Sequence, residues 1–278
     1  MSKIVKKLVK NSNHALFVGL HLLSARKRHA MYSIYAYGKH LDDIASSSAS
    51  LPQKLELFDE WRTEIGNIFD RARPTSDVGS TMWKNLRDFH LNRDDFLLAL
   101  DSKKSELLRH IVAPKWAEYY AFCDAQCASF LRSALRILGC SDPQIAADLA
   151  RSLGIALQTT IVLRDLKDAA MEGSLYIPAD CLQQAGVSLT SPLEALSDNN
   201  LAVARGQLAK VAAENYDHAL AIIAGLPRKL AARLKSFVYI YQYCFKVMEN
   251  RGWEVITPKP CADGFTKLRL ACKAYLGK

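Results

Sequence analysis

Helical character is clearest in AMYSIYAYGKHLDDIA, residues 30–45. Apolar side chains recur there at three- and four-residue steps, the period that gives an α-helix one apolar face. Outward from this stretch the same period recurs, and strand-like alternation is essentially absent; the stretches that share it are 51–65, 116–138, 143–166, 201–224 and 226–251. With no internal repeat and no long linker, the sequence predicts a single all-α domain over residues 1–278.

Charge is unevenly distributed along the chain, which has a formal net charge of +9. Residues 1–41 hold eight basic and no acidic residues, and residues 226–278 hold eleven basic and three acidic residues. The stretch between them, 42–225, is net acidic. Basic ends of this kind suit a nucleic acid, an anionic membrane surface or a small phosphorylated substrate, and charge alone does not choose among them.

Seven cysteines without a CxxC pair indicate a reducing compartment. The basic start followed by a short apolar run is like a signal peptide, but His21 interrupts that run and Arg26-Lys27-Arg28 follow it directly. No apolar run reaches the roughly 18 residues of a membrane span. A cytoplasmic protein is therefore expected, and membrane-surface contact through the N-terminal lysines stays open beside an ordinary solvated end; these are Lys3, Lys6, Lys7 and Lys10.

Two acidic segments stand out as candidate chemistry. Asp42 and Asp43 close the aromatic helix segment of 30–45. In QTTIVLRDLKD, residues 158–168, Asp165 and Asp168 are three apart and are expected to share a helical face with Gln158. Carboxylates offered by two helices suit Mg²⁺ ions that bridge to diphosphate oxygens. Caps and solvated charges are the alternative interpretation of all four aspartates.

The residues of these stretches and their order along the chain resemble the squalene/phytoene synthase family, and its bacterial squalene and presqualene diphosphate synthases most of all. The resemblance runs from about Asn13 to Leu276. Besides 30–45 and 154–169, the matching stretches are Leu22-Leu23, Arg26–Arg28, Glu60–Arg62, Asp94–Leu97, Trp116, Phe122–Asp124, Gly173, Leu175–Pro178 and Arg251–Trp253. The resemblance implies an isoprenoid-synthase-like helical bundle around a central cavity, and a transferase that joins prenyl diphosphates such as farnesyl diphosphate.

The resemblance also implies roles for individual residues. The implied Mg²⁺ ligands are Asp42, Asp43, Asp165 and Asp168; the implied catalytic residues are Tyr35 and Arg164; the implied substrate-binding residues are Lys39, Gln158 and Tyr37. Tyr35 and Tyr37 would shelter an allylic cation. Three of them have a plainer interpretation: aromatic core packing for Tyr35, contact with a buried backbone group for Gln158, and an ion pair with a neighbouring carboxylate such as Asp168 for Arg164.

Several departures from the family pattern affect the implied metal site. Where the family has metal-binding residues, this chain has Ser46, Ile161 and Ala169. Lys39 replaces an arginine, Ser174 replaces another, and the early hydroxyl-bearing phosphate segment is Ala15-Leu16-Phe17. Asp168 stands one residue before one of the missing ligands, on a neighbouring part of the same helical face.

Two functions remain open from the sequence. One is a prenyl-diphosphate transferase of isoprenoid biosynthesis that uses Mg²⁺. The other is a catalytically inactive relative that binds an isoprenoid, a lipid or a protein partner. A nucleic-acid partner is not expected, because the basic residues form no recognised binding module.

Overall fold

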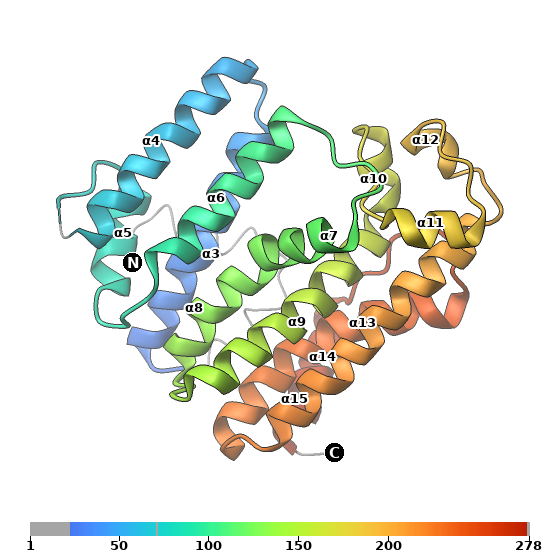
Figure 1. Ribbon diagram of the computed structural model, residues 1–278. Coiled ribbons are helices and arrows are strands. Elements are labelled where there is room, and N and C mark those ends of the chain that lie inside the picture. The colour runs from blue at the N-terminus through green and yellow to red at the C-terminus, as the bar shows by residue number, and fades with distance from the viewer. Residues whose placement is uncertain (1–22, 71, 277–278) are drawn as a thin grey trace. The chain divides into compact units, whose positions relative to one another are not determined.

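A computed structural model describes residues 23–70 and 72–276, and every regular element in that part of the chain is a helix. The first helices along the chain are α3 (Ala25–Ser46), α4 (Leu51–Phe69), α5 (Asp77–Leu86), α6 (Arg93–Leu108), α7 (Trp116–Cys123), the π-helix η1 (Asp124–Ala128) and α8 (Ser129–Leu138). After them come α9 (Pro143–Arg164), α10 (Leu166–Met171), α11 (Ala179–Ala185), α12 (Pro192–Ala195), α13 (Leu201–Ala224), α14 (Arg228–Arg251) and α15 (Gly264–Leu276) (Figure 1). The all-α prediction is confirmed.

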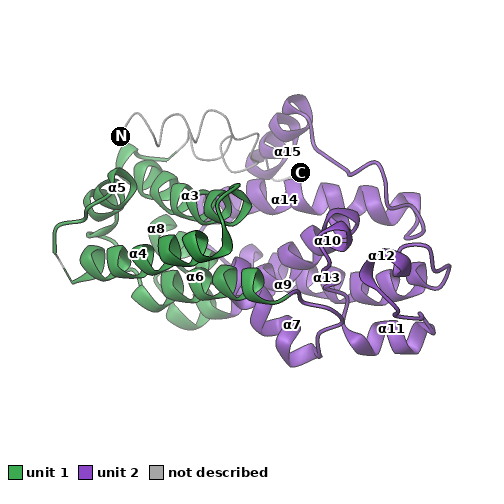
Figure 2. Cartoon of the chain, turned by 90° about the horizontal axis from the view of Figure 1, so that it is seen from above, with its two compact units in different colours: residues 1–109, 129–147 green, residues 110–128, 148–278 purple. Residues whose placement is uncertain are grey.

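The chain divides into two compact units, coloured separately in Figure 2. Unit 1 comprises residues 1–109 and 129–147, and unit 2 comprises residues 110–128 and 148–278. Each unit is interleaved in sequence with the other, so neither corresponds to one continuous half of the chain. The predicted single domain over 1–278 stays a prediction.

Unit 1 is built on an aromatic core between α3, α4, α6 and α8. Tyr37 of α3 is fully buried, and its ring lies 5.6 Å from Trp61, 5.4 Å from Phe96 and 6.1 Å from Phe130, measured between ring centroids. Its hydroxyl donates to the backbone carbonyl of Phe96 at 2.8 Å. A buried tyrosine whose hydroxyl is satisfied in this way anchors the helices around it.

A buried carboxylate fixes the connection between α4 and α5 in unit 1. Glu64 is 4% exposed and accepts hydrogen bonds from the backbone N–H groups of Thr75, at 2.9 Å, and Ser76, at 2.7 Å. Both hydroxyls also donate to it. Gly79 leaves room for this carboxylate, because a Cβ at that position would lie 2.0 Å from Oε1 of Glu64. The N-terminal end of α5 is thereby held by a charge that is satisfied on several sides.

Unit 2 is centred on α9, whose residues from Asp148 onward belong to it. Two buried hydroxyl pairs hold α9 to its neighbours: Thr159 to Tyr119 of α7 at 2.7 Å, and Thr160 to Tyr216 of α13 at 2.9 Å. Gly154 allows η1 to come close to α9, since a Cβ there would lie 2.7 Å from that of Ala128. Helix α14 packs against α13 and α15. The C-terminal end of α9, which carries the second acidic segment, is thus fixed from several sides.

By length and composition, α9 is long and apolar enough to cross a membrane. However, 61% of the most apolar window of this helix is buried within the protein. A core helix of this length meets the same criterion, so α9 is weak evidence for a membrane span. The N-terminal lysines on which membrane contact was predicted lie outside the described residues, and so does the segment 15–17.

Candidate functional site

The first acidic segment lies in the last turns of α3, in unit 1, and its two carboxylates point to different cations. Asp43 is ion-paired with Lys39, one turn earlier on the same helix. Asp42 is ion-paired with Lys103 of α6, at 3.0 Å. Both aspartate side chains are about half exposed, at 54% for Asp42 and 45% for Asp43. The hydrogen bond with Asp43 raises the pKa of Lys39 above its ordinary value, although burial of the amine opposes this.

The two tyrosines with predicted roles differ in their surroundings. Tyr37 belongs to the aromatic core of unit 1, with its hydroxyl bonded to the Phe96 carbonyl. Tyr35 is half-buried and stands one turn before Lys39. Packing within the aromatic core therefore accounts for the contacts of Tyr37. The catalytic role of Tyr35 and the substrate-binding role of Tyr37 stay predictions.

The spacing of the second acidic segment predicts one continuous helix from Gln158 to Asp168. The structure differs, because the chain bends at Asp165. Helix α9 ends at Arg164, and Asp165, with φ −98° and ψ 12°, is the N-cap residue that precedes α10. The bend allows Arg164 to bind its immediate neighbour through two bonds, from Nε to Oδ1 at 3.0 Å and from a terminal nitrogen to Oδ2 at 2.6 Å. Adjacent residues on a regular helix do not face each other, so this fork-shaped pair requires the interruption.

Arg164 does pair with a neighbouring carboxylate, as the plainer interpretation of the sequence has it, but that carboxylate is Asp165 and not the example Asp168. Asp168 is instead ion-paired with Lys259, and the same ammonium lies 2.9 Å from Oδ1 of Asp165. Lys259 comes from the loop between α14 and α15. Sequence reasoning missed it because nothing marks it except its place between two prolines, Pro258 and Pro260.

The resulting cluster Arg164–Asp165–Lys259–Asp168 has the electrostatics of a coupled network. Burial alone would raise the pKa of Asp165, but hydrogen bonds and charges from Arg164 and Lys259 lower it below its ordinary value. The hydrogen bond to Asp165 raises the pKa of Arg164. Burial opposes the charge of Lys259, yet its bonds to both aspartates raise its pKa overall. These pKa shifts hold Arg164, Asp165 and Lys259 in their charged forms near neutral pH.

Gln158 is buried, at 7% exposed, within unit 2. Its side-chain oxygen accepts a hydrogen bond from the thiol of Cys127 at 3.2 Å. This contact gives a buried polar group a partner inside the protein, although the partner is a thiol and not the backbone group of the plainer interpretation. The predicted role of Gln158 in binding substrate stays a prediction.

The four aspartates of the predicted metal set do not fit a divalent ion as they stand. Each is ion-paired with a lysine or arginine of its own unit. Among residues 23–70 and 72–276, no group of three or more His, Cys, Asp or Glu side chains is arranged to hold a metal within either unit. The hydroxyl of Ser46, where the resemblance to the family implies a carboxylate, donates to the backbone carbonyl of Asp42 at 2.8 Å.

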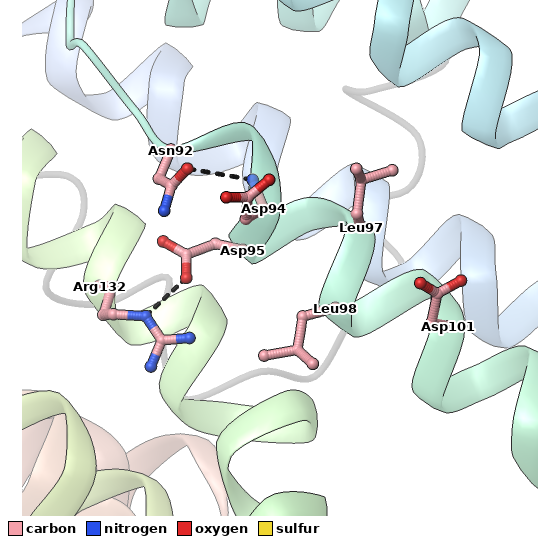
Figure 3. Close-up of a pocket in the computed structure, with 7 residues that line it drawn as sticks. All are labelled: Asn92, Asp94, Asp95, Leu97, Leu98, Asp101 and Arg132. Carbon is pink, nitrogen blue, oxygen red and sulfur yellow. Dashed lines mark hydrogen bonds and ion pairs between the residues drawn. The ribbon is translucent and has the colours of Figure 1, made fainter.

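A separate pocket of about 510 Å³ opens in unit 1 at the N-terminal end of α6 (Figure 3). It is lined by Asn92, Asp94, Asp95, Leu97, Leu98, Asp101 and Arg132. Figure 3 shows Arg132 directed at Asp95, and its Nε donates to Oδ1 at 2.5 Å. No predicted site residue lines this pocket, so it contributes nothing to the two acidic segments.

Comparison with solved structures places the helical architecture in a known group. The chain superimposes on the squalene synthase HpnC from Alicyclobacillus acidocaldarius with a TM-score of 0.80 at 19% identity, covering 90% of this chain and 94% of that one. A dehydrosqualene synthase in complex with ligand gives a TM-score of 0.82 at 20% identity, covering 99% and 95%. The expected isoprenoid-synthase type of fold is confirmed by these neighbours.

Sequence comparison gives the relationship directly. A presqualene diphosphate synthase of Sinorhizobium fredii is 31% identical over 239 residues, which cover 86% of this chain and 85% of that protein. A phytoene synthase of Mycobacterium bovis is 26% identical over 276 residues, covering 98% and 89%. The family profile described as squalene/phytoene synthase matches residues 9–269. On this match, the chain belongs to the squalene/phytoene synthase family.

Proposed function

We propose that this protein binds prenyl diphosphates, farnesyl diphosphate among them, and transfers their prenyl group in isoprenoid biosynthesis. Family membership over residues 9–269 supports the reaction class. The observation that carries the proposal is the pair of cations, Arg164 and Lys259, fixed side by side at the junction of α9 and α10. Fixed cations of this kind suit the oxygens of a diphosphate.

The chemistry asked of these residues is to stabilise a leaving diphosphate. When the bond between the allylic carbon and the diphosphate oxygen breaks, the electron pair leaves with the diphosphate and a carbocation remains. The guanidinium of Arg164 and the ammonium of Lys259 stabilise the negative charge that develops on the leaving group. Asp165 keeps the guanidinium oriented through its two hydrogen bonds.

A divalent metal in such a reaction would supply further positive charge to the leaving oxygens. The predicted use of Mg²⁺ rests on the resemblance to the family. The aspartates predicted to hold Mg²⁺ are already paired with lysine or arginine side chains. For this reason we assign the stabilisation of the leaving diphosphate to Arg164 and Lys259 alone.

A second candidate is a relative that binds a prenyl diphosphate or another isoprenoid without converting it. Ser46, Ile161 and Ala169 favour it, because serine, isoleucine and alanine remove carboxylate and amide ligands that the resemblance implies. Loss of those ligands removes catalytic electrostatics while leaving the helical scaffold intact. The two candidates share a ligand class and differ in turnover.

The test is incubation of the purified full-length chain with farnesyl diphosphate, with and without Mg²⁺, while released diphosphate and the isoprenoid product are measured. We expect turnover in the wild type and a loss of about 10²-fold in Arg164→Met, the scale seen when one charge-stabilising donor is removed. The control is Arg151→Met, which removes an exposed arginine of the same helix.

Circular dichroism and thermal unfolding would show whether both variants remain folded. Turnover that is equal in Arg164→Met and in the wild type would contradict the assignment of Arg164. Saturable binding of farnesyl diphosphate without any product would select the non-catalytic candidate.

A further inference from the structure

We propose that Lys259 is a built-in counter-cation, whose ammonium occupies the position between Asp165 and Asp168 where a divalent ion would otherwise bind. The second acidic segment would then neutralise its own carboxylates and need no metal. This concerns the site of the proposed function, but metal binding to the resting protein can be measured whether or not the protein turns over a substrate.

The geometry supports a bridging role. One nitrogen atom, Nζ of Lys259, contacts Oδ1 of Asp165 at 2.9 Å and also Oδ2 of Asp168. A cation bound to two carboxylates three residues apart is the arrangement that a metal ion would adopt. An ammonium has three donors and satisfies both carboxylates without the six closely spaced oxygens that Mg²⁺ requires.

The formal charge of the cluster points the same way. Asp165 and Asp168 contribute two negative charges, and Arg164 and Lys259 contribute two positive charges. A divalent ion would enter a neutral cluster and meet an ammonium already on both carboxylates. Ile161 and Ala169, on either side of Asp165 in the sequence, offer no oxygen from their side chains to compensate.

Lys259 is held in place by the loop that carries it. Arg251, at the end of α14, donates to the carbonyls of Ile256, at 3.4 Å, and Pro258. Arg205 of α13, 1% exposed, donates to the carbonyl of Trp253 in the same loop. These guanidinium contacts, together with the restricted backbone on both sides of Lys259, position the ammonium on the cluster rather than leaving it on a free chain.

The first experiment measures Mn²⁺ binding to the full-length chain by electron paramagnetic resonance, with no substrate present. We expect no binding that depends on Asp165 in the wild type. Lys259→Met removes the ammonium that contacts both carboxylates and leaves only Arg164 on Asp165. This variant should bind Mn²⁺ at least about 10-fold more tightly than the wild type, and adding Asp165→Asn should remove that gain. Lys210→Met, which removes an exposed lysine of α13, is the matched control and should behave as the wild type.

Wild-type Mn²⁺ binding that disappears in Asp165→Asn would overturn the proposal. So would a Lys259→Met variant that is folded by circular dichroism but binds Mn²⁺ no better than the wild type. Lys259→Arg provides a second check, because a retained positive charge should keep Mn²⁺ out.

The second experiment measures binding of inorganic diphosphate by calorimetry in the presence of a chelator. With Lys259 as the resident cation, the wild type should bind diphosphate without metal, and Lys259→Met should bind it at least about 10-fold more weakly. A strict requirement for added metal in the wild type would contradict the inference. If the metal and diphosphate results hold but farnesyl diphosphate is never converted, the counter-cation stands and the transferase proposal falls.

Discussion

The two acidic segments of this protein contain the same residue type and differ in what surrounds them. In unit 1, Asp42 and Asp43 are about half exposed and each meets one lysine. In unit 2, Asp165 is 29% exposed, is paired with both Arg164 and Lys259, and shares Lys259 with Asp168. Asp168 is 59% exposed, so the difference in burial lies at Asp165. Because solvent screens Asp165 less than the other three carboxylates, its ion pairs should contribute more to stability than theirs. Burial and shared partners, rather than the presence of aspartates, decide which segment can act on a ligand.

The largest expected effect tests whether burial determines how much a carboxylate of unit 1 contributes to the free energy of unfolding. Glu64→Gln removes a charge that accepts two backbone N–H bonds and two hydroxyl bonds around Thr75 and Ser76. We expect the free energy of unfolding to fall by about 2–3 kcal/mol, since hydrogen bonds to a buried charge are among the strongest. Urea denaturation measures it. If the free energy of unfolding falls by less than about 0.5 kcal/mol, the scale of an exposed ion pair, burial does not explain the strength of this carboxylate.

The next effect compares the acidic segments directly. Asp165→Asn leaves Arg164 and Lys259 without their shared carboxylate and should cost roughly 1–2 kcal/mol. Asp42→Asn breaks one exposed pair with Lys103 and should cost less than about 0.5 kcal/mol. Denaturant unfolding of both variants in parallel gives the difference. Equal costs would show that the two segments are energetically alike.

Acid should make this difference disappear. The pKa of Asp165 in the folded protein lies below its ordinary value, so its contribution is complete above the unfolded pKa of about 3.9 and is lost as pH falls through the folded pKa. We therefore expect the difference in free energy of unfolding between the wild type and Asp165→Asn to be constant near neutral pH and to shrink below about pH 4. Stability curves against pH measure the gap. A gap that grows in acid would have the wrong sign and contradict the assigned ion pairs.

Glu64 should add to the acid sensitivity of the wild type. Its hydrogen bonds from Thr75 and Ser76 outweigh burial and lower its pKa, so the stability that it contributes is also lost as pH falls. The Glu64→Gln variant separates this part, because its stability should fall less steeply in acid than that of the wild type.

The smallest effect concerns salt. A double-mutant cycle on Asp42 and Lys103 should give a coupling of a few tenths of a kcal/mol that falls toward zero at about 1 M salt. The cycle on Arg164 and Asp165 should keep most of its coupling under the same conditions, because both side chains are about 70% buried. Equal salt sensitivity of the two cycles would remove the distinction between the segments.

Much of the fold follows from local sequence. The apolar period of 30–45 becomes α3, and the stretch 201–224 becomes α13 with the same limits. Capping is local as well: the backbone N–H and the hydroxyl of Ser50 both donate to the side-chain oxygen of Gln53 at the start of α4. Such features are predictable because they depend on residues within one or two helical turns.

The candidate site was only partly predictable. The spacing of Asp165 and Asp168 identifies the segment, but it predicts a continuous helix, and the structure shows a bend that allows Arg164 to bind Asp165. Lys259 lies 91 residues from Asp168 in sequence, and no local pattern connects them.

By itself, the sequence determined an all-helical chain of the squalene/phytoene synthase type, and it determined which ligand positions of that family are occupied by Ser46, Ile161 and Ala169. Only the tertiary structure decided how the remaining carboxylates are neutralised. The physical reason is that helical periodicity is a short-range property, whereas an ion pair depends on which loops the fold brings together. Here the fold brings Lys259 to Asp165 and Asp168, and thereby determines the charge that an incoming diphosphate would meet.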